Sequence, residues 1–203
     1  MNKRKAGMAL AWLGAFILWT LLVRFVDVQP IGPLESTVGL ASINGAFHQF
    51  TGVHLSLYNL TDWLSLIPLG IVAGFGLQGL VQWIRRGCLT KVDFSLLMLG
   101  GFYVVVMGVF VLFEVLVINY RPILIEGVLE GSYPSSTTML VMCIMPTAVM
   151  RCKRKWLAFF LTAFAVFMVV ARLLSGVHWL TDIIGGAILS VSLVGLYDAF
   201  ISE

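Results

Sequence analysis

Residues 172–200 read RLLSGVHWLTDIIGGAILSVSLVGLYDAF, and this stretch decides the fold. From His178 onward it stays apolar for about 20 residues, the length that a helix needs to cross a bilayer. Arg172, His178 and Asp182 stand together at the mouth of this apolar run. Ionisable groups at membrane depth are costly and usually persist only with a function or a partner, so these three residues are candidates for a functional site.

The composition places the rest of the chain in a membrane as well. Of the 203 residues, 60% are hydrophobic and 11% are charged, whereas soluble domains carry about 25% charged residues. Apolar runs predict six transmembrane helices, the fourth of them short, over residues 7–23, 64–84, 94–118, 136–150, 156–174 and 178–200. The sequence therefore predicts an all-α fold, a polytopic membrane helix bundle that forms a single transmembrane domain over residues 1–203.

Basic residues predict how the bundle sits in the membrane. Most of the 13 lysines and arginines fall in three groups, at residues 3–5, 85–91 and 151–155. The positive-inside rule places these groups, and with them both termini, in the cytoplasm. Arg24, Arg121 and Arg172 remain for the outer side. Because the basic residues are scattered over short loops rather than gathered in a patch, no nucleic-acid partner is expected.

The first apolar run is expected to stay in the membrane. Arg24 follows it without a small-residue cleavage pattern, which favours an uncleaved span over a signal peptide. The outer segment that comes next, residues 27–63, mixes prolines and glycines with too many apolar residues for a free loop. We expect short interfacial helices there. We interpret His48 and His54 in this segment as interfacial polar residues rather than catalytic ones.

Small residues and cysteines give further expectations. Two glycine groups predict close packing between helices, namely Gly70, Gly74 and Gly76 in the second span and Gly185 and Gly186 in the last. The three cysteines show no metal-binding spacing, and no structural disulfide is expected among Cys88, Cys143 and Cys152.

The four-residue spacing of His178 and Asp182 places both side chains on one face of a helix, within hydrogen-bond reach. A carboxylate behind an imidazole fixes its tautomer and stabilises its cation, as a histidine nucleophile or base requires. Arg172 lies just upstream, where its guanidinium could grip an anion. The plainer alternative is a buried polar pair that bridges helices, with an arginine anchored at the headgroup level.

Two further polar islands lie on the same predicted side of the membrane. Residues 119–122, Asn-Tyr-Arg-Pro, end the third span, because proline cannot continue a helix. Residues 133–138, Tyr-Pro-Ser-Ser-Thr-Thr, open the fourth span, with Ser135 as a good N-cap. A helix start with hydroxyls and free amides is an anion site, although a plain helix cap has the same residues. Together the three islands favour a phosphate site in which His178 could attack phosphorus.

These residues resemble the motifs of the type 2 phosphatidic acid phosphatase family, which includes bacterial membrane lipid phosphatases. The family shows Lys, six residues, Arg-Pro; then Pro-Ser-Gly-His; then Ser-Arg, five residues, His, three residues, Asp. The chain matches the first motif at Arg121-Pro122 and the second at Pro134-Ser135. It matches the third and most specific motif, with both gaps, at Arg172, His178 and Asp182. The resemblance covers most of the chain.

The resemblance implies a role for each matching residue. His178 is the nucleophile that forms a phosphohistidine, and Asp182 orients it. Arg121, Ser135 and Arg172 hold the phosphate oxygens, and neither a metal nor a cofactor is needed. With the loop charges, the resemblance implies a multi-pass protein of a bacterial plasma membrane, with its site on the extracytoplasmic face.

Three motif positions depart from the family pattern. Glu114 stands where the family has lysine, Ala171 where it has serine, and Thr137 where it has histidine, with Ser136 in the place of glycine. Glu114 precedes Arg121 by two helical turns and shares its face. We expect it either to pair with an arginine or, if protonated, to donate a hydrogen bond.

Thr137 is too weak an acid to protonate a leaving oxygen, as the histidine of the family does. Glu126 or Glu130, in the same outer loop, could substitute for it. A good leaving group, such as the phosphate of a pyrophosphate, would also reduce the need for an acid.

The sequence thus predicts a metal-independent phosphatase acting on a lipid phosphate or pyrophosphate, such as phosphatidic acid, phosphatidylglycerol phosphate or polyprenyl pyrophosphate. The apolar tail would enter sideways from the bilayer while the head reaches the arginines. Two alternatives stay open. One is a phosphotransferase that passes the phosphohistidine group to an acceptor other than water. The other is a lipid-phosphate binding protein that has lost turnover.

Overall fold

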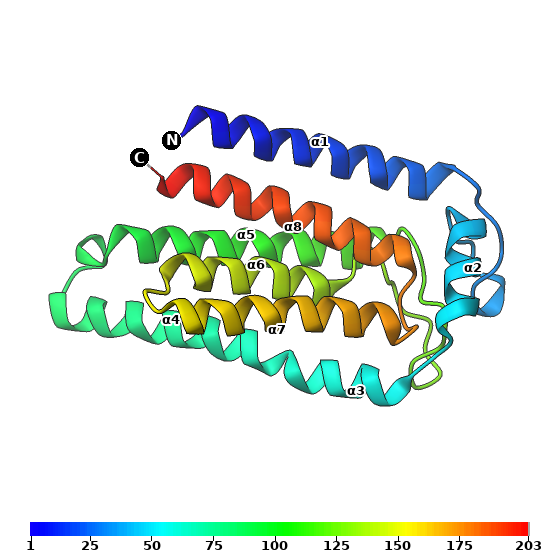
Figure 1. Cartoon of the computed structure of the whole chain (residues 1–203). Helices are drawn as coiled ribbons and strands as arrows, with labels where there is room; N and C mark the ends of the chain where they lie inside the picture. Colours follow the sequence, from blue (N-terminus) through cyan, green and yellow to red (C-terminus); the bar gives the residue numbers. More distant parts are fainter. Residues whose placement is uncertain (203) are drawn as a thin grey trace.

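The computed structural model describes residues 1–202 as an all-α protein (Figure 1). Within these residues, five helical stretches are long and apolar enough to cross a membrane. They are α1 (Lys3–Phe25), α4 (Leu66–Arg86) with α3 (Leu55–Leu64) directly before it, α5 (Phe94–Leu116), α7 (Lys155–Leu174) and α8 (Leu180–Ile201). A sixth apolar helix, α6 (Ser136–Arg151), has 16 residues. The membrane bundle predicted from the sequence is confirmed, with the fourth span the short one.

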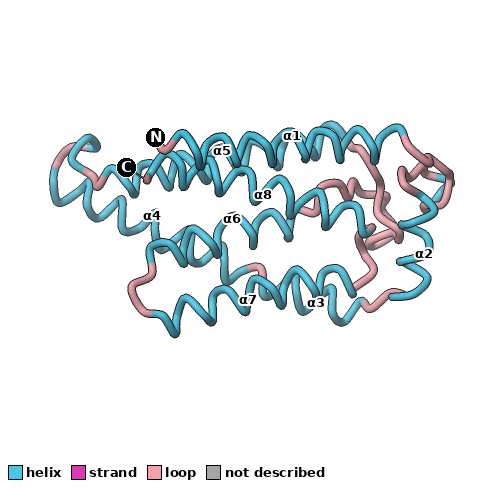
Figure 2. The backbone as a smooth tube through the Cα atoms, turned by 45° about the horizontal axis from the view of Figure 1, so that its top comes forward, coloured by secondary structure: helices cyan, strands magenta, loops and turns pink. Residues whose placement is uncertain are grey.

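Helix α8 lies at the centre of the bundle, whereas α4 lies at its edge. α1 packs along α8, and α6 lies between α7 and α8 (Figure 1 and Figure 2). In the apolar window of α8, 56% of the residues are buried, compared with 6% in the window of the α3–α4 stretch. α8 is therefore enclosed by protein, and most of α4 is left to face lipid.

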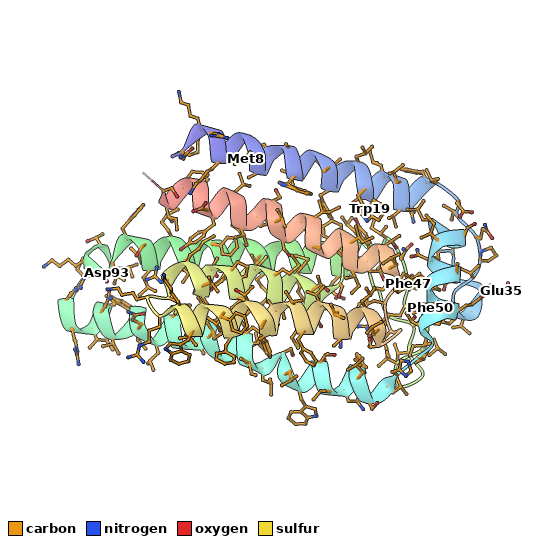
Figure 3. All side chains as sticks on the ribbon, viewed as in Figure 1. Met8, Trp19, Glu35, Phe47, Phe50 and Asp93 are labelled. Atoms are coloured by element: carbon orange, nitrogen blue, oxygen red, sulfur yellow. The ribbon has the colours of Figure 1, made fainter. Side chains whose placement is uncertain are left out.

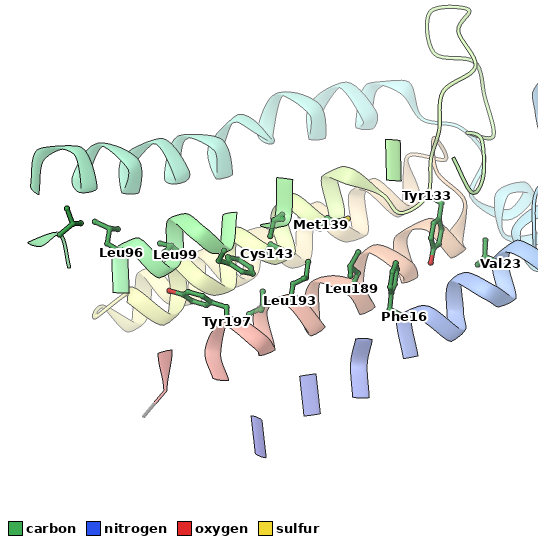
Figure 4. Packing of buried hydrophobic residues seen from close by; sticks show 14 residues of the cluster. Phe16, Val23, Leu96, Leu99, Tyr133, Met139, Cys143, Leu189, Leu193 and Tyr197 are labelled. Carbon is green, nitrogen blue, oxygen red and sulfur yellow. The ribbon is translucent and has the colours of Figure 1, made fainter. Parts of the chain in front are cut away.

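A hydrophobic core joins α1, α5, α6 and α8, and it includes Tyr133 from the segment before α6 (Figure 4). The ring of Tyr133 stacks on Phe16, with centroids 6.3 Å apart, and its hydroxyl forms a 2.7 Å hydrogen bond with Thr20. Gly185 allows this position, because a Cβ there would come within 2.6 Å of the Tyr133 ring. The close packing predicted for this glycine is thus observed, and it fixes the start of α6 against α8.

The two ends of the bundle carry different parts of the chain. Both termini and the α4–α5 and α6–α7 connections lie at one end, where Asp93 is labelled (Figure 1 and Figure 3). The helix α2 (Ala41–Thr51) and the segments 117–135 and 175–179 lie at the opposite end, which we call the α2 end (Figure 1). The three polar islands therefore share the end that lies away from the basic loops.

Residues 27–63 fold into short helices, as expected for an interfacial segment. Besides α2 and α3 they include the single 3₁₀ turn η1 (Pro33–Glu35). A second 3₁₀ turn, η2 (Leu89–Lys91), lies outside this segment, between α4 and α5. His48 Nε2 lies 3.1 Å from the carbonyl oxygen of Gly176, and His54 Nε2 lies 2.9 Å from that of Thr51. Both imidazoles thus bind backbone carbonyls, which agrees with a non-catalytic role.

Several details of the expected spans are wrong. The third span ends at Leu116, and the last begins at Leu180, so that His178 precedes the helix instead of opening it. Gly70, Gly74 and Gly76 do not pack against a neighbouring helix. No atom of residues 1–202 outside their own helix turn would lie within 4 Å of a Cβ added at any of the three.

Candidate active site

The three polar islands meet at the α2 end around the imidazole of His178. Arg121 Nη1 lies 3.4 Å from His178 Nε2, at the long limit of a hydrogen bond. Asp182 Oδ2 lies 3.6 Å from His178 Nδ1. This distance is that of an ion pair and exceeds a hydrogen bond, so the two side chains lie close together as predicted but do not form the expected hydrogen bond. His178 is 3% exposed and Asp182 is fully buried.

The backbone that leads into α8 places His178. Gly176 has a φ of +68°, and a side chain there would collide with the carbonyl oxygen of Gly52. Glycine is therefore required both for the left-handed conformation and for the close approach. Further along, Asp182 accepts the backbone N–H of Trp179 at 2.9 Å. This bond caps α8 and holds the carboxylate next to the imidazole.

Arg121 comes from a short hairpin between α5 and α6. Its backbone N–H donates to the carbonyl of Glu130 at 3.0 Å. Its Nε also lies 3.0 Å from Glu130 Oε2, in an ion pair without hydrogen-bond alignment, and the Glu130 side chain is 42% exposed. Trp179 Nε1 donates to the carbonyl of Tyr120 at 2.7 Å, which ties the hairpin to the start of α8. The Nε edge of the guanidinium thus faces Glu130, while Nη1 faces His178.

Arg172, near the end of α7, is 2% exposed and is bound by α3. Its Nη1 donates to Thr61 Oγ1 at 3.0 Å, and its Cζ lies 4.6 Å from the ring centroid of Tyr58. Asp62 Oδ1 lies 3.9 Å from Nη2. Sequence reasoning missed these contacts, because Thr61 is 111 residues away from Arg172 and belongs to no motif.

Ser135 is the N-cap of α6, as predicted. Its Oγ accepts a hydrogen bond from Thr138 Oγ1 at 3.1 Å, and its backbone N–H donates to the carbonyl of Asp182 at 3.1 Å. Thr137 is buried in the first turn of the helix, with its side chain bordering a groove described below. Ser136, and not Ser135, borders the small cavity next to His178. The hydroxyl of Ser135 is therefore engaged in capping, and that of Ser136 is the one at the cavity.

The three glutamates singled out in the sequence occupy different places. Glu114, near the end of α5, borders the small cavity together with Arg121 and His178. Glu130 pairs with Arg121. Glu126 is exposed at the tip of the hairpin and does not line this cavity. Only the first two are therefore placed to act at the site. Within residues 1–202, no three His, Cys, Asp or Glu side chains are arranged to hold a metal ion.

The charge state of His178 follows from its surroundings, and the residue lies outside the membrane-spanning helices. Burial lowers its pKa well below the ordinary 6.5, and the charges of Arg121 and Arg172 lower the pKa further. A lowered pKa favours the neutral imidazole, which is the form that can act as a nucleophile or base.

A long apolar groove adjoins this site. It has a volume of about 890 Å³ and lies between α4, α5 and α6. Its lining runs from Ser65, the N-cap of α4, to Trp83 on that helix. This is about 27 Å at 1.5 Å per residue and close to the roughly 30 Å hydrocarbon core of a bilayer. Ser136 borders both the groove and the small cavity at His178. The groove thus leads from the cluster of charges into the depth of the membrane.

Comparisons with known proteins agree with this arrangement. Residues 115–201, which contain the three islands, match the model of the PAP2 superfamily. The fold is similar to the crystal structure of the first transmembrane PAP2 type phosphatidylglycerolphosphate phosphatase from Bacillus subtilis, with a TM-score of 0.61 and 16% identity over 96% of this chain and 98% of that chain. At this identity the similarity shows the fold alone. No curated protein sequence matches the chain.

Proposed function

We propose that the chain, whose residues 115–201 match the PAP2 superfamily model, is a type 2 phosphatidic acid phosphatase, a membrane enzyme that hydrolyses a lipid phosphate or pyrophosphate through a phosphohistidine on His178. One observation carries the proposal: the buried imidazole of His178 and the guanidinium of Arg121 lie 3.4 Å apart at a small cavity, and Ser136 at this cavity also borders a long apolar groove. Guanidiniums bind phosphate oxygens by paired, charge-assisted hydrogen bonds. An apolar groove of this length suits a lipid tail.

The reaction would run in two steps. In the first, His178 Nε2 attacks phosphorus, a P–N bond forms and the P–O bond to the leaving group breaks. Arg121 and Arg172 stabilise the charge on the phosphoryl oxygens. Asp182, at 3.6 Å from Nδ1, stabilises the imidazolium that develops. In the second step, water attacks phosphorus, a P–O bond forms and the P–N bond breaks. The attacking water gives its proton to the group that protonated the leaving oxygen, and inorganic phosphate leaves with the imidazole restored.

The leaving oxygen needs a proton when it is an alkoxide. Thr137 occupies the family position for this acid and is too weak to supply it. Glu130 is engaged in the ion pair with Arg121, and Glu126 lies at the hairpin tip. We assign the acid to Glu114, whose side chain borders the same cavity as His178.

The site would face the outer side of a bacterial plasma membrane, with both termini in the cytoplasm. The support is the distribution of charge: the three basic groups lie at helix ends and in the connections between them at the terminal end of the bundle, and the charged site lies at the other end.

The test compares purified wild type, His178→Ala and the matched control His54→Ala, whose imidazole binds only a backbone carbonyl. Phosphate release is measured from phosphatidic acid, phosphatidylglycerol phosphate and polyprenyl pyrophosphate. We expect wild type and the control to release phosphate and to carry an acid-labile phosphate bound to the protein. His178→Ala should show neither the release nor the bound phosphate. Binding without release from any of the three lipids would indicate a binding protein. Labelled phosphate on an acceptor other than water would indicate a transferase.

A further inference from the structure

Helix α3 lies outside the region that matches the family model, yet it holds one of the two arginines of the site. Arg172 Nη1 donates to Thr61 Oγ1 at 3.0 Å, and the Tyr58 carbonyl lies 3.5 Å from the same nitrogen. The ring of Tyr58 lies against the guanidinium, with Cζ 4.6 Å from the ring centroid. Arg172 is 2% exposed and Thr61 is fully buried, so this contact is shielded from water.

The Thr61 hydroxyl is oriented toward the guanidinium by its own backbone contact. It donates to the carbonyl of Tyr58 at 2.8 Å. Since its proton is used there, a lone pair is left for Arg172, and the hydroxyl acts as an acceptor of fixed direction. A valine at this position would keep the shape and remove the acceptor.

The partners of the two arginines differ in charge. Arg121 has a carboxylate, that of Glu130, at 3.0 Å. The carboxylate nearest to Arg172, that of Asp62, is 3.9 Å away and its side chain is 63% exposed, which makes the pair weak. A neutral hydroxyl and an aromatic face therefore fix the direction of Arg172 without cancelling its charge.

The connection between α2 and α3 fixes α3 against the loop that joins Arg172 to His178. The backbone N–H of His54 donates to the carbonyl of Ser175 at 2.9 Å. Gly176 packs directly on the Gly52 carbonyl. α3 is thus held in register with both the arginine and the nucleophile.

We infer that Tyr58 and Thr61 are positioning residues for the reaction, which hold the guanidinium of Arg172 in the direction in which it binds the phosphoryl group. The inference rests on the proposed function. It extends the site to a helix that carries none of the family motifs. The ligand is the tetrahedral phosphoryl anion, and the contact acts on its binding through Arg172.

The experiment measures two quantities: the Kd of orthovanadate, a tetrahedral analogue of phosphate, and kcat/KM for a lipid phosphate. Thr61→Val should weaken both about 10- to 100-fold, because it removes one hydrogen bond to a charged group. Tyr58→Leu should weaken both about 3- to 30-fold through loss of the aromatic face. The conservative variants Thr61→Ser and Tyr58→Phe should stay near wild type. Thr162→Val is the matched control, because this threonine is exposed on α7 and bonds only to its own helix.

A double-variant cycle separates positioning from a general structural effect. In an Arg172→Met background no donor is left for Thr61, so adding Thr61→Val should change the vanadate Kd by less than about threefold, because the two changes act through one interaction. Full additivity of the two losses would overturn the inference. So would wild-type vanadate binding by both Thr61→Val and Tyr58→Leu with unchanged thermal unfolding. If wild type binds vanadate but releases no phosphate from any lipid, the proposed function fails while the vanadate data still decide the role of α3.

Discussion

Gly76 offers a direct test of where the lipid tail lies. This residue lines the groove on α4, and no atom of residues 1–202 beyond its own helix turn would lie within 4 Å of an added Cβ. It follows Ser65, at the head of the groove, by eleven residues, which is about 17 Å along the helix. Half of the hydrocarbon core is about 15 Å. A leucine at this position would therefore narrow the groove just beyond the middle of the bilayer.

The expected magnitude follows from the volume that the new side chain takes. Leucine brings four carbon atoms into the groove and would displace about four methylene groups of a tail that passes this level. At about 0.8 kcal/mol for each buried methylene, the loss is about 3 kcal/mol, or roughly 100- to 200-fold in kcat/KM. A tail that ends above Gly76 should not be affected.

The assay compares two polyprenyl pyrophosphates with the same head group, one with a short tail and one with a tail long enough to cross the midplane. Gly76→Leu should lower kcat/KM for the long substrate only. Gly74→Leu is the control, since Gly74 lies on the same helix with equally open surroundings and does not line the groove. Equal losses for both substrates, or equal losses in both variants, would refute the placement of the tail.

Three further changes test the chemistry and the backbone of the site. Glu114→Gln should slow hydrolysis of a lipid phosphomonoester by about 10²- to 10⁴-fold, the usual loss on removing a general acid. Hydrolysis of a pyrophosphate should slow much less, and similar losses for the two substrates would exclude this role. Gly176→Ala should lower the melting temperature in detergent together with activity, because alanine is strained at a φ of +68°; an unchanged melting temperature would contradict the backbone argument. The acid limb of the kcat/KM profile should have its midpoint below 6.5, because burial and the neighbouring arginines lower the pKa of His178 and keep its imidazole neutral as the pH falls. Arg121→Gln should move that midpoint upward, and a midpoint above 6.5 in wild type would show that the imidazole is not in this environment.

The sequence predicted the bundle because membrane insertion leaves few choices. Apolar runs of spanning length must form helices in lipid, where every backbone group has to be satisfied internally. Loop charges and the position of the polar islands then implied that Arg121, Ser135 and His178 share one end, and the structure brings them together there.

What the sequence could not predict depends on contacts between distant segments. Thr61 and Tyr58 looked like ordinary residues of an interfacial helix, because only the folded chain brings them to Arg172. Gly76 was expected to pack against another helix, since small residues commonly mark helix contacts in membranes. It lines an open groove instead, and no local pattern distinguishes the two cases.

Two independent features of the site favour the same kind of substrate. In the proposed mechanism Thr137 cannot protonate the leaving oxygen, and Glu114 is the candidate donor. A phosphate leaving group needs this proton far less than an alkoxide does. From Ser65 to Trp83 the groove extends about 27 Å, which is longer than the roughly 15 Å that a tail confined to one leaflet spans. The loss of the family's acid at Thr137 and a groove longer than one leaflet are each unnecessary for a short phosphomonoester lipid. Together they favour a long-tailed pyrophosphate, whose chemistry needs little proton donation and whose tail would fill the lower half of the groove.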